Sequence, residues 1–277
     1  KGVYNMEPTA GGIVRYSYCT PDAVMGSWML DTRTSYAAIN TQNRWQGVIF
    51  PTGRTARIFP QSEAKGNGKT YQQHVAVQHR SVMVVANHPQ AKNAFALRVF
   101  VANNMRKNLT QRDGWAIVKE GDAWLGIRPL NDQGFDLKPL QQKKVKESTR
   151  QNTAGVWLWP RGQSSTKSSS KNSSVVFALS RTAKHKTLSS FLAWLTSHKQ
   201  DVRGGHSTYS FTDDLGEKVT MELGGKLPVP KVNGKPVDLF PKKVFDSPYV
   251  SAEHGSGVVT IQKDDRKLVL DFNGGAN

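Results

Sequence analysis

The sequence predicts a mainly β fold, a large antiparallel β-sandwich of the super-sandwich type with one amphipathic helix. Ten or more short runs of strand composition are separated by turn signals, which is typical of sandwiches. The runs 115–118 and 123–127 flank the turn Lys119-Glu120-Gly121-Asp122 and are apolar without strict alternation, so both faces of this hairpin should be covered. Only 187–198 repeats its apolar residues at helical spacing.

The sequence predicts one connector followed by one β-domain. Residues 1–12 are polar, contain Gly and Pro, and are expected to form a connector from a preceding domain. A single sandwich domain then extends over 13–273. Its expected strands are 13–19, 24–30, 43–50, 56–59, 74–77, 82–85, 95–101, 115–118, 123–127, 155–159, 175–179, 207–211, 218–223, 257–262 and 266–272.

Two segments between these strands lack the pattern of a regular element. Residues 161–174 are dominated by Ser and Lys and cannot supply apolar surface to a core, so we expect a mobile loop there. Residues 229–244 combine prolines with lysines and are expected to run along the fold without regular pairing.

Composition restricts the class of partner more than the chemistry. The chain has 277 residues and a net charge of +17, from 38 Lys+Arg against 21 Asp+Glu, which favours a polyanionic partner. No recognition helix or zinc-finger spacing accompanies this charge, so specific nucleic-acid binding is not expected. No apolar run is long enough for membrane insertion. The single cysteine, Cys19, excludes an internal disulfide and is expected to be buried.

Three stretches carry a resemblance to a known family. Residues 43–60, 114–130 and 245–272 read NRWQGVIFPTGRTARIFP, GWAIVKEGDAWLGIRPL and FDSPYVSAEHGSGVVTIQKDDRKLVLDF. They resemble the carboxy-terminal β-sandwich of two-domain polysaccharide-processing enzymes, the heparinase II/III-like polysaccharide lyases. In that family an α/α-toroid precedes the sandwich and carries most catalytic residues. The resemblance implies a secreted or periplasmic protein whose partners are an acidic polysaccharide and a toroid domain of the same precursor, upstream of Lys1.

A lyase of this kind cleaves a uronic-acid-containing glycan by β-elimination. It must neutralise a sugar carboxylate, remove the neighbouring carbon-bound proton and protonate the leaving oxygen, work suited to Arg, His and Tyr. We take Arg15, Tyr16 and His79 as catalytic candidates, with Arg80 and Tyr18 as substrate-binding neighbours. The alternative for each is a side chain that only packs within a half-buried strand.

Further substrate-binding candidates lie around the Ser/Lys segment. Trp157 and Trp159 share a strand face by parity and could stack on sugar rings, although most tryptophans of a sandwich lie in its core. Lys167 and Lys171 could contact a sulfated or uronic polymer as point charges, or simply be solvated.

The sequence predicts no cofactor and leaves two alternative functions open. No metal-ligand spacing such as HExxH or CxxC is present, and no cofactor is predicted, which leaves open a structural or catalytic divalent metal shared with the missing domain. A non-catalytic carbohydrate- or polyanion-binding module is the alternative function, and an accessory domain of a glycoside hydrolase is the third. A lyase needs a polar cleft with a perturbed His or Tyr, whereas a binding module needs only a basic, aromatic surface.

Overall fold

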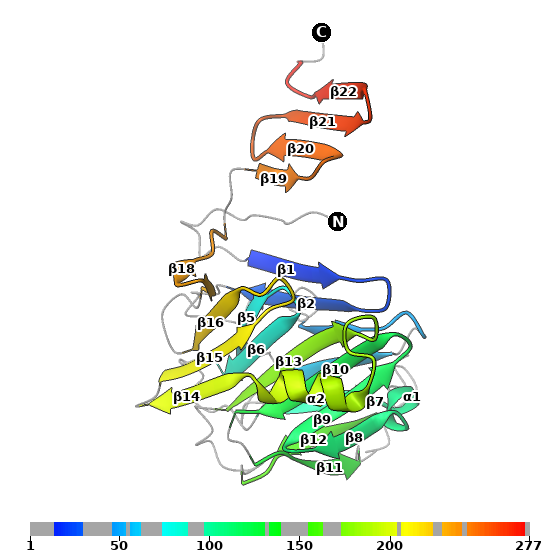
Figure 1. Cartoon of the computed structure of the whole chain (residues 1–277), viewed down its shortest axis with the longest axis vertical. Helices are drawn as coiled ribbons and strands as arrows, with labels where there is room; N and C mark the ends of the chain where they lie inside the picture. Colours follow the sequence, from blue (N-terminus) through cyan, green and yellow to red (C-terminus); the bar gives the residue numbers. More distant parts are fainter. Residues whose placement is uncertain are drawn as a thin grey trace, which may run out of the picture.

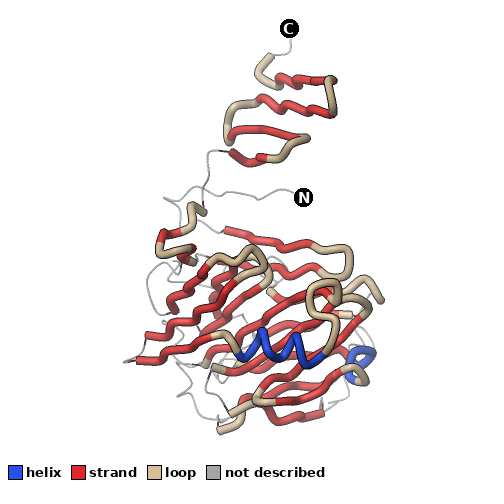
Figure 2. Tube along the Cα trace, viewed as in Figure 1, coloured by secondary structure: helices blue, strands red, loops and turns tan. Residues whose placement is uncertain are grey.

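The computed structural model describes most of the chain as antiparallel β-structure (Figure 1). The described residues are 14–29, 46–53, 56–61, 74–87, 97–130, 133–139, 155–162, 173–203, 206–223, 229–239 and 243–274. They form four antiparallel sheets and two short helices, so the predicted mainly β class is confirmed (Figure 2). No helix among these residues is long and apolar enough to cross a membrane.

Two large sheets face each other and make the sandwich. The seven-stranded sheet has the order β1 (Val14–Cys19), β2 (Val24–Met29), β3 (Gly47–Ile49), β4 (Arg57–Gln61), β7 (Arg98–Ala102), β12 (Gly155–Pro160) and β11 (Phe135–Pro139). The six-stranded sheet has the order β5 (His74–His79), β6 (Val82–Asn87), β13 (Ser174–Arg181), β10 (Ala123–Pro129), β9 (Trp115–Glu120) and β8 (Leu109–Arg112).

A third layer covers the other side of the six-stranded sheet (Figure 1). It consists of the helix α2 (Leu188–Thr196) and a five-stranded sheet of β14 (Lys199–Arg203), β15 (His206–Thr212), β16 (Lys218–Leu223), β17 (Lys231–Val232) and β18 (Lys235–Pro236). The helix begins as expected, because the side chains of Thr187 and Ser190 form a reciprocal capping box. A further single-turn helix, α1 (Asn103–Arg106), follows β7.

The hairpin of β9 and β10 lies in the middle layer and is buried on both faces. Ala116 and Val118 belong to the core between the two large sheets, whereas Trp115 and Ile117 belong to the core under α2 and the five-stranded sheet. All four are at most 1% exposed. The prediction that both faces of this hairpin are covered is therefore confirmed, and the alternation of the two cores follows the period of two along a strand.

Two expectations about local structure were wrong. Residues 231–236 are paired, because Asn233 and Gly234 take positive φ values of 50° and 81° and close a tight hairpin between β17 and β18. Asn-Gly is the usual signal for such a turn and outweighs the prolines on either side. Cys19 is exposed rather than buried, since it ends the edge strand β1.

The last sheet stands apart from the three layers. It contains β19 (Lys243–Asp246), β20 (Val250–Glu253), β21 (Val258–Lys263) and β22 (Arg266–Asp271), and it includes the expected hairpin of 257–262 and 266–272. In Figure 1 it lies beyond β18, away from the two large sheets. Every residue of β22 is exposed, so neither face of this edge strand is covered.

Candidate functional site

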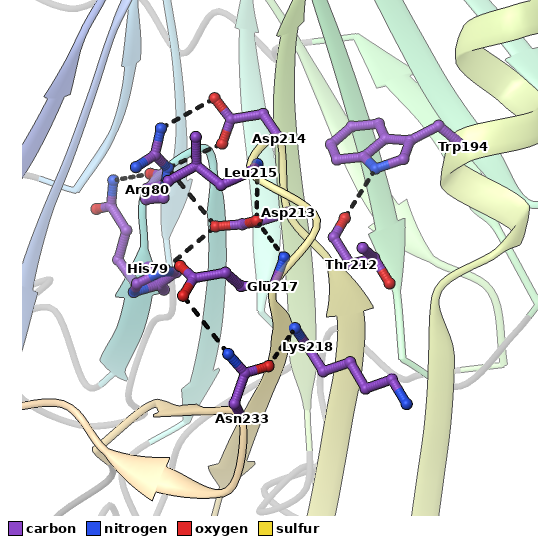
Figure 3. Close-up of polar contacts among 11 residues, drawn as sticks. His79, Arg80, Trp194, Thr212, Asp213, Asp214, Leu215, Glu217, Lys218 and Asn233 are labelled. Carbon is purple, nitrogen blue, oxygen red and sulfur yellow. Dashed lines mark hydrogen bonds and ion pairs between the residues drawn. The ribbon is translucent and has the colours of Figure 1, made fainter.

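Polar side chains gather where two turns meet, a place that we call the corner (Figure 3). His79 and Arg80 come from the end of β5 and its tight turn into β6, where Arg80 adopts a positive φ of 50°. Asp213, Asp214 and Glu217 come from the turn between β15 and β16. The corner therefore joins the six-stranded sheet to the five-stranded sheet.

Asp213 organises the second of these turns. Its Oδ1 accepts hydrogen bonds from the backbone N–H of Leu215 at 2.8 Å and of Glu217 at 2.9 Å. The backbone of Gly216 adopts a positive φ of 82°, which glycine tolerates without strain. The side chain of Asp213 is 0% exposed, so this carboxylate is built into the fold and aimed by its own turn.

The other oxygen of Asp213 faces the first turn without accepting a hydrogen bond. Oδ2 is buried and lies 3.7 Å from Nε2 of His79 and 3.7 Å from Nε of Arg80, both beyond hydrogen-bonding distance. Nε2 of His79 is likewise buried without a hydrogen-bond partner. Burying two polar atoms without a hydrogen bond costs free energy in a folded protein.

The ionisation of His79 decides what kind of contact this is. Burial lowers the pKa of His79 below its usual value, the Asp213 carboxylate opposes this shift, and the positive charge of Arg80 adds to it. The distance to Asp213 alone would fit an ion pair, but the lowered pKa of His79 favours a neutral imidazole at neutral pH. A neutral imidazole can accept a proton or bind a metal.

Arg80 is held by a second carboxylate, that of Asp214. Nε of Arg80 donates to Oδ1 of Asp214 at 2.8 Å, and a terminal guanidinium nitrogen donates to Oδ2 at 3.0 Å, which makes a two-pronged ion pair. Burial raises the pKa of Asp214, but the hydrogen bond and the charge of Arg80 outweigh it and the pKa lies below its usual value. The pair locks the two turns together while taking two of the five N–H groups of Arg80.

Two tyrosines of the edge strand β1 border the same corner. Burial raises the pKa of the Tyr16 hydroxyl above its usual value, and the backbone and charge of Arg80 oppose this shift. Burial also raises the pKa of Tyr18, which interacts electrostatically with Asp214 and Arg80. Both hydroxyls therefore keep their protons at neutral pH, in the form that can donate one.

The structure brings together four of the residues chosen from the sequence. Tyr16, Tyr18, His79 and Arg80 meet at the corner, whereas Arg15 is described only as a backbone position of β1, paired with Trp28. Lys167 and Lys171 lie outside the described residues.

Trp157 and Trp159 lie on β12 of the seven-stranded sheet, one face of which is turned away from the sandwich core. The guanidinium carbon of Arg98 lies 3.8 Å from the ring centre of Trp157 and 5.2 Å from that of Trp159. Phe100 meets Trp157 edge to face at 5.3 Å. The two tryptophans share a strand face, and Arg98 packs against both rings. Both tryptophans were chosen from the sequence, but Arg98 was not.

The acidic half of the corner was missed by sequence reasoning. Asp213 and Asp214 lie between the expected strands 207–211 and 218–223 and were interpreted only as part of that connection, and Glu217 carried no prediction. The signal available was the density of carboxylates in Asp213-Asp214-Leu215-Gly216-Glu217, unusual in a chain of net charge +17. Nothing in it indicates which histidine or arginine the turn would meet.

Comparison with known proteins adds no relative, because no family model, no curated protein and no solved structure matches the chain. The resemblance to heparinase II/III-like lyases thus stays a prediction.

Proposed function

We propose that this chain is the β-sandwich portion of an enzyme that cleaves an acidic, uronic-acid-containing glycan by β-elimination. The observation that supports it is the meeting of Tyr16, Tyr18, His79 and Arg80 at one corner, although they come from strands far apart in the sequence. These are the residue types that such a reaction requires. A secreted or periplasmic location and a toroid partner belong to the same proposal.

The roles follow from the chemistry of the groups. The N–H groups of Arg80 that Asp214 does not engage donate to the sugar carboxylate and stabilise the negative charge that develops next to it. His79 accepts the proton from the carbon beside the carboxylate, and a carbon–carbon double bond forms as the glycosidic oxygen leaves. Tyr16 or Tyr18 donates a proton to that oxygen. The products are one chain with a new reducing end and one with an unsaturated terminal sugar.

The test is to incubate the purified chain, and the full-length product of its gene, with uronic-acid and sulfated glycans while following the ultraviolet absorbance of unsaturated sugars. Tyr16→Phe and Tyr18→Phe are compared with Tyr249→Phe, since Tyr249 is 64% exposed in the separate sheet. We expect one of the first two to lower kcat by about a hundredfold or more, and the control to have no effect. The absence of unsaturated product from either protein with every glycan would overturn the proposal.

The alternative function is binding of an acidic glycan without cleavage, on the outward face of the seven-stranded sheet. The stack of Arg98 on Trp157 and Trp159 favours it, because aromatic rings pack on sugars and guanidinium groups bind carboxylates and sulfates.

This alternative predicts retention of the chain on an acidic-glycan column at moderate salt. Trp159→Ala should elute at lower salt than the unchanged chain, and Tyr249→Ala should not. Equal elution of all three would leave only the general attraction of a basic protein, which salt screens, and would contradict a specific surface.

A further inference from the structure

We propose that His79, Asp213 and Glu217 form a binding site for a first-row divalent metal ion, with Zn²⁺ as the best fit. One ligand atom from each residue lies within 4.8 Å of the other two. The inference rests on this cluster alone and does not depend on glycan cleavage.

The strongest support is the pair of buried atoms that face each other without a hydrogen bond. Asp213 Oδ2 and His79 Nε2 are both inaccessible, and 3.7 Å separates them. Ligand atoms bound to Zn²⁺ at roughly 2.0–2.2 Å in a tetrahedron lie about 3.4 Å apart, so a cation between these atoms requires a shift of a few tenths of an ångström. A bound ion would satisfy both atoms at once.

Glu217 supplies the third ligand with modest movement. It is half-buried, and among the described residues its Oε1 accepts one long hydrogen bond, from Asn233 at 3.5 Å. Its backbone is anchored, because its N–H donates to the same Asp213 whose other oxygen would bind the metal. The turn thus holds two of the three ligands in a fixed relation, which lowers the entropy cost of binding.

Local charge favours a cation at this point despite the basic chain. Asp213, Asp214 and Glu217 carry three negative charges, and Arg80 carries one positive charge that the two-pronged bond with Asp214 engages. These four side chains sum to two formal negative charges before the positive charge of Lys184, which also acts on Asp214, is counted, while the whole chain has a net charge of +17. Arg80 Nε lies 3.7 Å from Asp213 Oδ2 and would be displaced slightly from a bound ion.

The ligand set selects the kind of ion. Ca²⁺ and Mg²⁺ prefer oxygen ligands throughout, whereas one imidazole with two carboxylates suits Zn²⁺ and its neighbours. Three protein ligands leave a fourth position open to water or to an anionic group, as in catalytic zinc sites. A cation bound at Nε2 competes with His79 as a proton acceptor, so metal binding and glycan cleavage are best measured separately.

The experiment uses the whole chain, stripped with a chelator and titrated with Zn²⁺ by calorimetry, with Co²⁺ as a visible-absorption probe. We expect one equivalent to bind, a rise in the unfolding temperature, and the absorption bands of Co²⁺ with nitrogen and oxygen ligands. His79→Gln and Glu217→Gln should each weaken binding by at least about tenfold. Asp213→Asn serves as the third variant, because it keeps an oxygen for the two turn hydrogen bonds while removing the charge.

Matched controls separate this site from adventitious surface binding. His254→Gln changes an exposed histidine, and Glu222→Gln changes an exposed carboxylate of the neighbouring strand that pairs with Lys231. Neither should alter affinity. If the unchanged chain bound no Zn²⁺, or if His79→Gln and Glu217→Gln bound it as tightly as the controls while remaining folded by circular dichroism, the proposal would be wrong.

Discussion

Burial determines the ionisation of single residues in this protein, and His198 is the clearest case. It lies directly after α2, with its ring 4.6 Å from that of Trp194 and 5.4 Å from that of Phe211. Nδ1 shares a hydrogen bond of 2.7 Å with the hydroxyl of Tyr209. Burial lowers the pKa of His198 to about 3, and no charged group contributes to the shift. The imidazole is therefore neutral in the folded state at neutral pH.

This burial predicts a loss of stability in acid. The folded-state pKa is below the ordinary value of about 6.5, so the unfolded chain binds the proton more tightly, and the free energy of unfolding falls as the pH drops from about 6.5 towards 3. By pH 5 this residue should account for a loss of about 2 kcal/mol, at 1.36 kcal/mol for each of roughly 1.5 pH units.

Urea unfolding at pH 7.5 and pH 5 measures the effect. His198→Asn should have a smaller loss between the two pH values than the unchanged chain, because it can accept the Tyr209 hydrogen bond but does not titrate. The variant His254→Asn, which changes an exposed histidine, should keep the full loss. Equal pH dependence in His198→Asn and the unchanged chain would contradict the prediction.

At the scale of elements, the contact between α2 and β10 depends on a glycine. A Cβ atom built on Gly126 would lie 2.6 Å from Cδ1 of Leu195 and 3.2 Å from Cε3 of Trp115. Both distances are shorter than ordinary van der Waals contact, so the helix sits as close to the sheet as a missing side chain allows. The apolar repeat predicted this helix, and the glycine determines its distance from the sheet.

Two substitutions at this contact should offset each other in part. Gly126→Ala should destabilise by about 1–3 kcal/mol through crowding, and Leu195→Ala by about 2–5 kcal/mol through the cavity it leaves. In the double variant the added methyl group occupies part of that cavity, so its loss should be smaller than the sum by about 0.5 kcal/mol or more. Chemical denaturation of the four proteins measures this coupling.

Gly53→Ala provides the control for the glycine substitution. A Cβ there would meet its nearest neighbour, Nδ2 of Asn104, at an ordinary 3.6 Å. Its effect should be small and additive with that of Leu195→Ala. Additive losses for Gly126→Ala and Leu195→Ala would show that the added methyl group does not occupy the space left by Leu195, and would contradict the prediction.

On the scale of the whole molecule, the four-stranded sheet of β19–β22 differs from the layered body. Among the residues that the structure describes, seven of the ten exposed large hydrophobic residues belong to it and its flanks: Phe245, Tyr249, Ile261, Leu268, Val269, Leu270 and Phe272. In β22, Leu268 and Leu270 alternate with Val269, so apolar side chains emerge on both faces. Such a sheet has no core of its own among the described residues.

Removal of this sheet should leave the body folded. A chain ending at Leu239 is expected to unfold at nearly the same temperature as the full chain, because the exposed strands bury little apolar surface against the body. It should also bind less of a dye such as anilinonaphthalene sulfonate, which reports exposed apolar surface. A large fall in unfolding temperature would instead make the sheet a structural part of the body.

The sequence predicted much of the fold because strand periodicity and turn residues are local properties. The doubly buried hairpin, the helix expected at 187–198 and the strands expected at 207–211 and 218–223 were recognised from them and are present, the helix as Leu188–Thr196. Strands such as β8, with the polar sequence Leu109-Thr-Gln-Arg112, were missed. Their regularity comes from hydrogen bonds supplied by a neighbouring strand, which their own side chains do not reveal.

The candidate site was predicted only in part, for the same physical reason. Tyr16, Tyr18, His79 and Arg80 were chosen by residue type and do meet, but the sequence could not assign them a partner. Arg80 and Asp214, 134 residues apart, are brought together by the stacking of one sheet on another.

By itself, then, the sequence determined the β-sandwich class, the position of the helix and the strongly basic character of the chain, since these follow from composition and local periodicity. Tertiary structure alone decided which turns meet, which carboxylate lies beside His79, and which histidines are buried neutral. Those properties depend on distance and on exclusion of water, and both arise only when the layers close around the side chains.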